Sequence, residues 1–181
     1  MSKSDTVLVR RRVRNYTGTS MLSDPAEVII KPFSPGDMDY LLKIQKACKG
    51  IAAWRTCDYE QLAGDPRGLL LVAESEGRIS QEIVGFSACY RIEAEAELWN
   101  IAVSPAHRRR GVARALLSEA CQRLSGLGVL KLFLEVRESN LPATELYRSF
   151  GFEPLARRKQ YYQNPREDAL LLVLKFPQPG V

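Results

Sequence analysis

The chain has 181 residues, of which 45% are hydrophobic and 26% charged, and its formal net charge is +5. This length suits one domain with a packed core, and this composition is typical of soluble globular proteins. No apolar run approaches the roughly 18 residues that a membrane-spanning helix needs. The N-terminus also lacks an apolar stretch followed by a cleavage site, so we expect a cytoplasmic protein without membrane association.

The cysteines and the single histidine argue against a metal site and against a disulfide framework. The four cysteines are scattered with no Cys-x-x-Cys pair, and His107 is the one histidine of the sequence. We therefore expect no metal, and free thiols that are mostly buried. The basic residues form separate clusters at 10–14, 108–114 and 157–159. Nucleic-acid binding needs a continuous basic stripe with aromatic stacking positions, so we expect none.

The first 26 residues differ from the rest of the chain. They are basic and polar, which predicts a flexible extension, although the apolar patch at 7–9 leaves an edge strand open as an alternative. A regular pattern begins at Glu27, so we place one folded domain at 27–177.

Hydrophobic periodicity within this domain predicts alternating strands and helices. Strands are expected over 28–33, 69–73, 83–92, 96–103, 130–136 and 169–176, with a short extra strand near 152–156 and turns near Gly77 and at 93–95. Helices are expected over 37–49, around 54–63, from near Arg109 to Gly126, and over 142–150. Antiparallel strands followed by a crossover indicate an α/β (α+β) fold, in which a mixed sheet of about six or seven strands has helices on both faces.

Residues 98–117 are the most informative segment. An apolar strand ends at Ser104-Pro105, and three consecutive arginines (108–110) then stand where a helix is expected to begin. The helix dipole presents positive charge at that end, which disfavours arginine there, and Arg114 adds a like charge four residues after Arg110. A bound anion would relieve this conflict, since free N–H groups, a glycine and guanidinium groups suit a phosphate. A merely solvated basic helix start is the alternative.

Three residues further along have both a structural and a chemical interpretation. Glu135 alternates with apolar neighbours in its strand, so it is either a solvated or salt-bridged surface residue or a partly desolvated general base. Tyr147 shares a helix face with Leu146 and Phe150, which indicates a core aromatic residue but leaves a cleft-facing phenol open. Asn140 precedes Pro142 and is first of all a candidate helix cap.

Three blocks in order resemble the GNAT acetyltransferase superfamily, most closely its branch that acts on peptide N-termini. The first is Asn100–Pro105 with Arg108-Arg109-Arg110-Gly111-Val112-Ala113, which is similar to the family's Gln/Arg-x-x-Gly-x-Gly/Ala loop. The second is Leu134–Asn140 followed by Leu146-Tyr147 and Gly151-Phe152. The third is Arg157–Tyr162 followed by Arg166–Ala169. The likeness is close over 98–174, weaker from about 27 to 97, and absent from 1–26.

The resemblance implies acetyl-CoA as co-substrate and assigns its binding residues. Backbone N–H groups of the loop would hold the pyrophosphate, with Gly111 allowing close approach. The strand before it would face the pantetheine and the thioester, and Asn140 would contact CoA. The implied cofactor-binding residues are Ile101, Ala102, Val103, Arg108, Arg109, Arg110, Gly111, Val112, Ala113, Arg114 and Asn140.

The resemblance also implies the chemistry and the acceptor side. Glu135 would remove the proton of the acceptor amine, directly or through a water, and Tyr147 would protonate the departing thiolate of CoA. Trp54, Tyr161 and Tyr162 stand where the family shapes its peptide entrance, although each also suits a core position. The family usually has Pro before that tryptophan, whereas this chain has Ala53.

The function expected from this resemblance is transfer of acetyl to the N-terminal amine of a protein, with the N-terminal alanine of a ribosomal protein as the target. Two alternatives stay open. One is the same chemistry on a lysine side chain or a small-molecule amine. The other is a non-catalytic module that binds acyl-CoA or a ribosome.

Overall fold

The computed structural model describes residues 9–11, 28–48, 50–76 and 81–177. The chain forms two compact units, one made of residues 1–88 and 100–120 and the other of 89–99 and 121–181. We call them unit 1 and unit 2 and describe each by itself. Strands β4 and β5 and helix α3 each have residues in both units.

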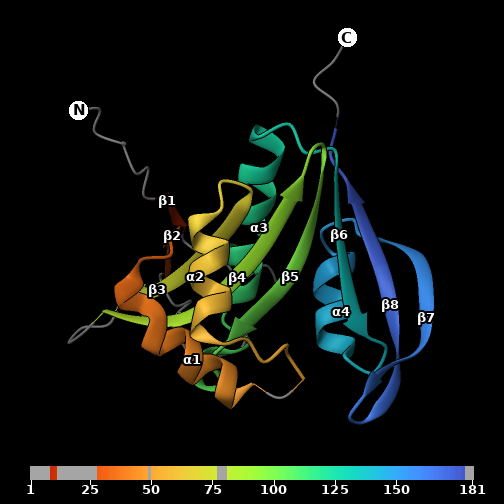
Figure 1. Cartoon of the computed structure of the whole chain (residues 1–181), viewed down its shortest axis with the longest axis horizontal. Coiled ribbons are helices and arrows are strands. Elements are labelled where there is room, and N and C mark those ends of the chain that lie inside the picture. The colour runs from red at the N-terminus through yellow and green to blue at the C-terminus, as the bar shows by residue number, and fades with distance from the viewer. Residues whose placement is uncertain (1–8, 12–27, 49, 77–80, 178–181) are drawn as a thin grey trace, which may run out of the picture. The chain divides into compact units, whose positions relative to one another are not determined.

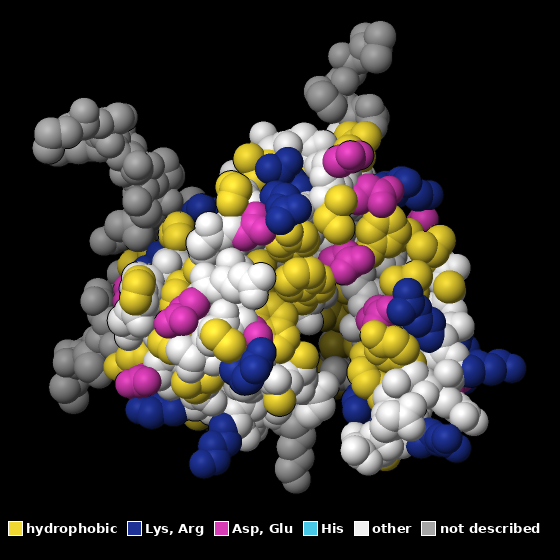
Figure 2. All heavy atoms as spheres, viewed as in Figure 1, with side chains coloured by type: hydrophobic (Ala, Val, Ile, Leu, Met, Phe, Trp, Pro, Cys, Tyr) yellow, Lys and Arg dark blue, Asp and Glu magenta, His cyan; other side chains and the backbone are white. Residues whose placement is uncertain are grey.

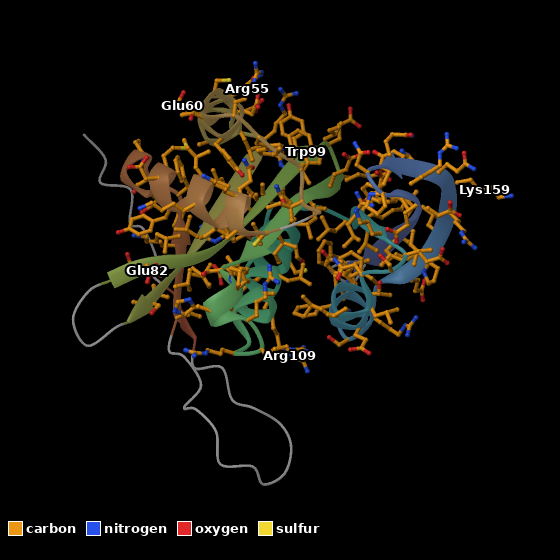
Figure 3. The ribbon with its side chains drawn as sticks, turned by 90° about the horizontal axis from the view of Figure 1, so that it is seen from below. Arg55, Glu60, Glu82, Trp99, Arg109 and Lys159 are labelled. Carbon is orange, nitrogen blue, oxygen red and sulfur yellow. The ribbon has the colours of Figure 1, made fainter. Side chains whose placement is uncertain are left out.

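Unit 1 contains strands in the hydrogen-bonded order β1-β2-β3-β4-β5, of which β1–β2 and β2–β3 are antiparallel pairs. The strand bounds are β1 Val9–Arg11, β2 Val28–Pro32, β3 Gly68–Glu76, β4 Gln81–Ile92 and β5 Glu95–Val103. The helices are the short 3-10 turns Pro35–Asp37 and Pro105–His107, with α1 Met38–Ala47, α2 Thr56–Gly64 and α3 Val112–Gly126. Figures 1 and 3 show α1 and α2 on one face of these strands and α3 on the other.

The core of unit 1 follows from this two-sided cover. Residues 83–88 of β4 are all buried, because helices pack against both faces of the strand. Fully buried Tyr59 of α2 meets Phe86 of β4 edge to face, with ring centroids 5.6 Å apart. This contact joins α2 to the strands and so fixes the segment that precedes α2.

Unit 2 contains strands in the order β4-β5-β6-β8-β7. The further elements are β6 Lys131–Arg137, α4 Leu141–Arg148, β7 Glu153–Gln163 and β8 Arg166–Lys175. Strand β6 runs parallel to β5 and antiparallel to β8, and β8 is antiparallel to β7. The expected alternation of β6 is confirmed, since Leu132, Leu134 and Val136 are buried whereas Glu135 is half-buried.

The mixed α/β sheet with helices on both faces is therefore confirmed, with three corrections. The described residues contain eight strands, because Val9–Arg11 pairs with β2 within the segment expected to be flexible. The strand expected near 152–156 extends to Gln163 and forms a hairpin with β8. Helix α3 begins at Val112 and not near Arg109. The turn expected near Gly77, and the other residues of 1–26, lie outside the described residues.

The late start of α3 has a backbone cause. Arg109 and Gly111 both have left-handed backbone angles, with φ of 62° and 81°. An α-helix needs φ near −63°, so it cannot form until Gly111 has been passed. The three arginines consequently lie in the loop before α3 and not in its first turn.

Candidate functional site

The loop Arg108–Gly111 of unit 1 presents backbone N–H groups next to a helix start. Left-handed residues that alternate with others in a turn aim successive N–H groups into one anion-binding concavity. The first N–H groups of a helix also have no partner within that helix. The sequence of left-handed Arg109, left-handed Gly111 and then α3 combines the two features. Arg109 and Arg110 are exposed, and Figure 3 shows the Arg109 side chain pointing away from the ribbon.

Arg108 behaves differently from its two neighbours. Its Nε donates to the backbone oxygen of Val103 at 3.2 Å, and its Nη2 donates to Sγ of Cys48 at 3.2 Å. The Cys48 thiol in turn donates to the same Val103 oxygen at 3.3 Å. Since Cys48 caps the end of α1, these contacts tie the loop to the end of β5 and to α1. The side chain of Arg108 thus has a structural role that the sequence did not indicate.

The end of β5 is packed closely against its neighbours in unit 1. A Cβ built on Gly85 of β4 would lie 2.9 Å from the backbone oxygen of Ala102 and 3.2 Å from side-chain carbons of Val112 and Leu116. The 2.9 Å approach to the Ala102 oxygen is shorter than real Cβ contacts, so only glycine lets β4 and β5 lie this close together at this point. Ala102 and Val103 are buried and Ile101 is half-buried. The end of β5 and the start of α3 therefore both pack closely against Gly85 of β4.

Trp54 lies in the segment between α1 and α2, as expected, and it is half-buried. Gln45 of α1 holds its backbone through two hydrogen bonds of 2.9 Å. The ring of Trp54 lies tilted at 52° against that of Tyr59, with centroids 5.1 Å apart. Buried Asn100 of β5 donates from Nδ2 to the backbone oxygen of Ala52 at 3.4 Å. The segment is thus held from α1, from α2 and from β5.

Glu135 of unit 2 has two partners on its half-buried carboxylate. Nη1 of Arg158 lies 2.7 Å from Oε1 of Glu135. The Tyr161 hydroxyl also hydrogen-bonds Glu135, and this bond is the main reason that the pKa of Tyr161 is raised. The guanidinium of Arg158 lies 5.5 Å from the centroid of the Tyr161 ring. The salt-bridged interpretation of Glu135 is therefore confirmed, and the structure brings Glu135 and Tyr161 together.

Arg158 is the residue that sequence reasoning missed. It belongs to the block Arg157–Tyr162 that resembles the GNAT family, but the resemblance implies a role only for Tyr161 and Tyr162 of this block. The register of β7 against β8 shifts between Arg158 and Tyr162, and Gln160 is left-handed with φ of 52°. Such an irregularity redirects side chains, so period-two alternation does not predict where Arg158 points.

Tyr147 on α4 is buried, with 5% of its surface exposed, and its ring lies 5.6 Å from that of Phe152. Burial raises the pKa of Tyr147, with smaller contributions from Cys89 and Tyr162. The phenol therefore keeps its proton at neutral pH, as a proton donor must. The core interpretation holds for its position, and the same burial is compatible with the expected chemistry.

Asn140 is the N-cap of α4. Its Oδ1 accepts from the backbone N–H of Ala143 at 3.3 Å, which confirms the capping interpretation. The amide nitrogen of a capping asparagine does not take part in the cap. Contact with CoA through this nitrogen stays a prediction.

Tyr162 and its surroundings tie the β7–β8 hairpin to β6. The guanidinium of Arg137 lies 4.0 Å from the centroid of the Tyr162 ring and pairs with Glu167 at 3.2 Å. A hydrogen bond from Ser139 lowers the pKa of Glu167. Arg157 pairs with Glu138 at 2.6 Å and with Asp168 at 2.8 Å. Figure 2 shows basic and acidic side chains beside one another over β7 and β8. Ion pairs and the contact of Arg137 with the Tyr162 ring thus connect the hairpin to β6 and to the segment that follows it.

The described part of the chain holds no group of three or more His, Cys, Asp or Glu that suits a metal ion. Its four cysteines are free thiols; Cys48 and Cys89 are buried, Cys121 is half-buried and Cys57 is exposed. Burial raises the pKa of Cys121 to about 12, so its thiolate is scarce at neutral pH and it is a poor nucleophile. Among the described helices none is both long and apolar enough to cross a bilayer.

Comparison with known proteins adds family evidence to this geometry. Residues 38–152 match the model of the acetyltransferase (GNAT) family. The chain is 41% identical over 95 residues to the ribosomal protein bS18-alanine N-acetyltransferase of Haemophilus ducreyi, which covers 51% of this chain and 66% of the relative. It is 34% identical over 140 residues to the enzyme of the same name from Haemophilus influenzae, which covers 67% of this chain and 95% of the relative.

Solved structures show the same fold. The ribosomal-protein-S18-alanine N-acetyltransferase of Escherichia coli has a TM-score of 0.75 and 30% identity, over 84% of this chain and 96% of that one. The structure of NAA60 from Arabidopsis thaliana with acetyl-CoA has a TM-score of 0.72 and 21% identity, over 82% and 98% of the two chains. At that identity the second likeness shows the fold alone.

Proposed function

The chain belongs to the acetyltransferase (GNAT) family, and we propose that it transfers an acetyl group from acetyl-CoA to the N-terminal amine of a protein. The observation that carries the proposal is the left-handed pair Arg109 and Gly111 directly before α3. This backbone turns N–H groups toward an anion at the position where the family's loop would hold a pyrophosphate. Arg109, Arg110 and Arg114 add the positive charge that such an anion needs.

The backbone of Ile101–Val103 is proposed to hold the pantetheine and the thioester. Gly85 of β4 supports this role, because its missing side chain lets the backbone of Ala102 lie close to β4. Asn140 is proposed to contact CoA through the amide nitrogen that its cap leaves over. Trp54, Tyr161 and Tyr162 are proposed to shape the acceptor entrance.

The chemistry is a direct transfer. The amine nitrogen attacks the thioester carbonyl carbon, its proton passes to Glu135, and the carbon–sulfur bond breaks as Tyr147 protonates the thiolate. An α-amino group has a pKa near ~8, so much of it is protonated at neutral pH and needs a base. Arg158 and Tyr161 support this role, because both contact the carboxylate of Glu135 and restrict its orientation.

We further propose an N-terminal alanine of a ribosomal protein as the acceptor, in the cytoplasm. Support comes from two relatives and a solved structure whose names specify this substrate, at 30% to 41% identity. Part of the match is short, since the alignment with the Haemophilus ducreyi enzyme spans 66% of that relative.

A peptide panel with labelled acetyl-CoA tests the proposal. Peptides that begin with Ala or Ser should gain one acetyl group, which mass spectrometry should locate on the α-amine. The matched control is the same peptide with a blocked N-terminus and an internal lysine, which should stay unmodified. If label appears only on the lysine or on a small amine, the acceptor is that amine and not a protein N-terminus. Acetyl-CoA binding without any turnover would support the non-catalytic module instead.

A further inference from the structure

Gln45 of α1 makes an unusual contact with the segment before α2. Its Nε2 donates to the backbone oxygen of Trp54, and its Oε1 accepts from the backbone N–H of the same residue, both at 2.9 Å. One side-chain amide therefore satisfies both backbone groups of Trp54, as a neighbouring strand would. An amide can do this because it carries both a donor and an acceptor, whereas a carboxylate cannot donate and an apolar side chain can do neither.

Tyr59 of α2 reinforces this contact. Its hydroxyl donates to Oε1 of Gln45 at 2.7 Å. Burial raises the pKa of Tyr59, so the hydroxyl keeps the proton that it donates. The Tyr59 ring is fully buried against Phe86 and also meets the Trp54 ring. The core of unit 1 thus fixes Gln45, and Gln45 with Tyr59 fixes both the backbone and the ring of Trp54.

This arrangement matters because residues 51–55 have neither helical nor strand structure. Such segments have high conformational freedom, and ordering one on ligand binding costs backbone entropy for every residue that becomes fixed. A segment already held by hydrogen bonds from α1, α2 and β5 incurs less of that cost when a ligand arrives. Trp54 is half-buried, so part of the residue remains accessible.

We infer that Gln45 is a positioning residue for the acceptor, which it serves by holding Trp54 in its binding conformation. This inference rests on the proposed function, in which Trp54 contacts the acceptor. Gln45 is expected to touch neither substrate. Its loss should therefore raise KM for the peptide and leave KM for acetyl-CoA unchanged.

The decisive variant is Gln45→Met, which keeps the length of the side chain and removes all of its hydrogen bonds. Two lost bonds to Trp54, each of typical strength, correspond to about a thirtyfold rise in KM for the peptide. Gln45→Glu keeps the acceptor atoms and loses the donor, so it should fall between wild type and Gln45→Met. The matched control is Gln61→Met on the exposed side of α2, which should change neither KM.

A spectroscopic arm separates this inference from the proposed function. The chain has two tryptophans, so Trp99→Phe leaves Trp54 as the single tryptophan, whose emission can be excited selectively. In this background Gln45→Met should shift the Trp54 emission to the red and increase its quenching by acrylamide, while circular dichroism shows the same fold. Gln61→Met should leave the emission unchanged.

The emission of Trp54 and the KM for the peptide together distinguish failure of the inference from failure of the proposed function. Unchanged Trp54 emission in folded Gln45→Met overturns the inference, whatever the enzyme does. Changed emission with an unchanged KM for the peptide in an active enzyme also overturns it. If the wild type acetylates no peptide, the proposed function fails, and the acceptor-positioning role of Gln45 fails with it. A red shift of the Trp54 emission in Gln45→Met would then show only that Gln45 holds Trp54. If Gln45→Met does not fold, Gln45→Glu and Tyr59→Phe carry both measurements.

Discussion

Glu135 has two neighbours in the tertiary structure that the alternation of its strand does not predict. Alternation along its strand places it opposite the buried face of β6, and the structure leaves it half-buried there. Arg158 and Tyr161 then come to it from β7, which is distant in the chain. The guanidinium and the phenol restrict the orientation of the carboxylate that the proposed chemistry uses as its general base.

Replacing Glu135 by glutamine should lower kcat/KM by about 10² to 10⁴, which is the typical contribution of one positioned proton transfer. Glutamine keeps the size and polarity, so acetyl-CoA affinity should stay near wild type. Steady-state kinetics and calorimetric acetyl-CoA titration check both parts. The control is Glu153→Gln, an exposed carboxylate on β7. If the Glu135→Gln enzyme is fully active, a group other than Glu135 is the general base.

Removing the hydroxyl of Tyr147 should lower the reaction rate less than replacing Glu135 does. Because burial raises the pKa of the phenol, it is a weak acid, and we expect Tyr147→Phe to reduce kcat by about 10², the low end of the range for proton transfer. The ring packing against Phe152 remains, so thermal stability should change little. Turnover and melting temperature measured together separate the two roles. Normal turnover with a large loss of stability would show that Tyr147 is only a core residue.

At the scale of whole elements, close packing around β5 positions the loop before α3. Gly85 admits Val112 and Leu116 to within contact of β4, and it lies against the backbone of Ala102. Arg108 adds hydrogen bonds from the loop to Val103 and Cys48. These two features fix the separation between the end of β5 and the start of α3. A loop that binds a phosphate between them requires such a fixed separation.

A methyl group at residue 85 should disturb this element pair. Its Cβ would lie 2.9 Å from the Ala102 oxygen, so Gly85→Ala should lower the free energy of unfolding by about 1–3 kcal/mol, as overpacking does. It should also raise KM for acetyl-CoA as β5 shifts. Chemical denaturation and kinetics measure the two effects. In the control Gly36→Ala the new Cβ meets nothing within 4 Å, and both quantities should stay within error. Equal effects in the two variants would contradict the packing argument.

For the molecule as a whole, the expected donor should act as a stabilising ligand. A ligand that binds only the folded state at 100 times its Kd stabilises it by about 2.7 kcal/mol. For a chain of this size that corresponds to a rise in Tm of roughly 5–10 °C. Pantetheine lacks the pyrophosphate, so it should give little or none of this rise. Thermal unfolding with each compound makes the comparison, and an equal rise with pantetheine would place the main affinity away from the loop Arg108–Gly111.

Most of the elements followed from the sequence alone, because hydrophobic periodicity and Gly or Pro boundaries are local signals. Helix α3 and strand β6 are examples, and the Asn140 cap is another. The three arginines near the expected helix start also predicted an anion site, and that stays a prediction. The start of α3 was predicted three residues early, since the left-handed angles of Arg109 and Gly111 leave no mark in periodicity.

Tertiary structure alone decided which residues meet. The ion pair of Glu135 with Arg158 depends on an irregular stretch of β7, and the hold of Gln45 on Trp54 depends on the turn between two helices. Arg108 was expected among the anion ligands, yet its side chain bonds Val103 and Cys48. A side chain's partner is set by the path of the backbone between distant segments. Periodicity reports which face a residue occupies but not what that face will meet.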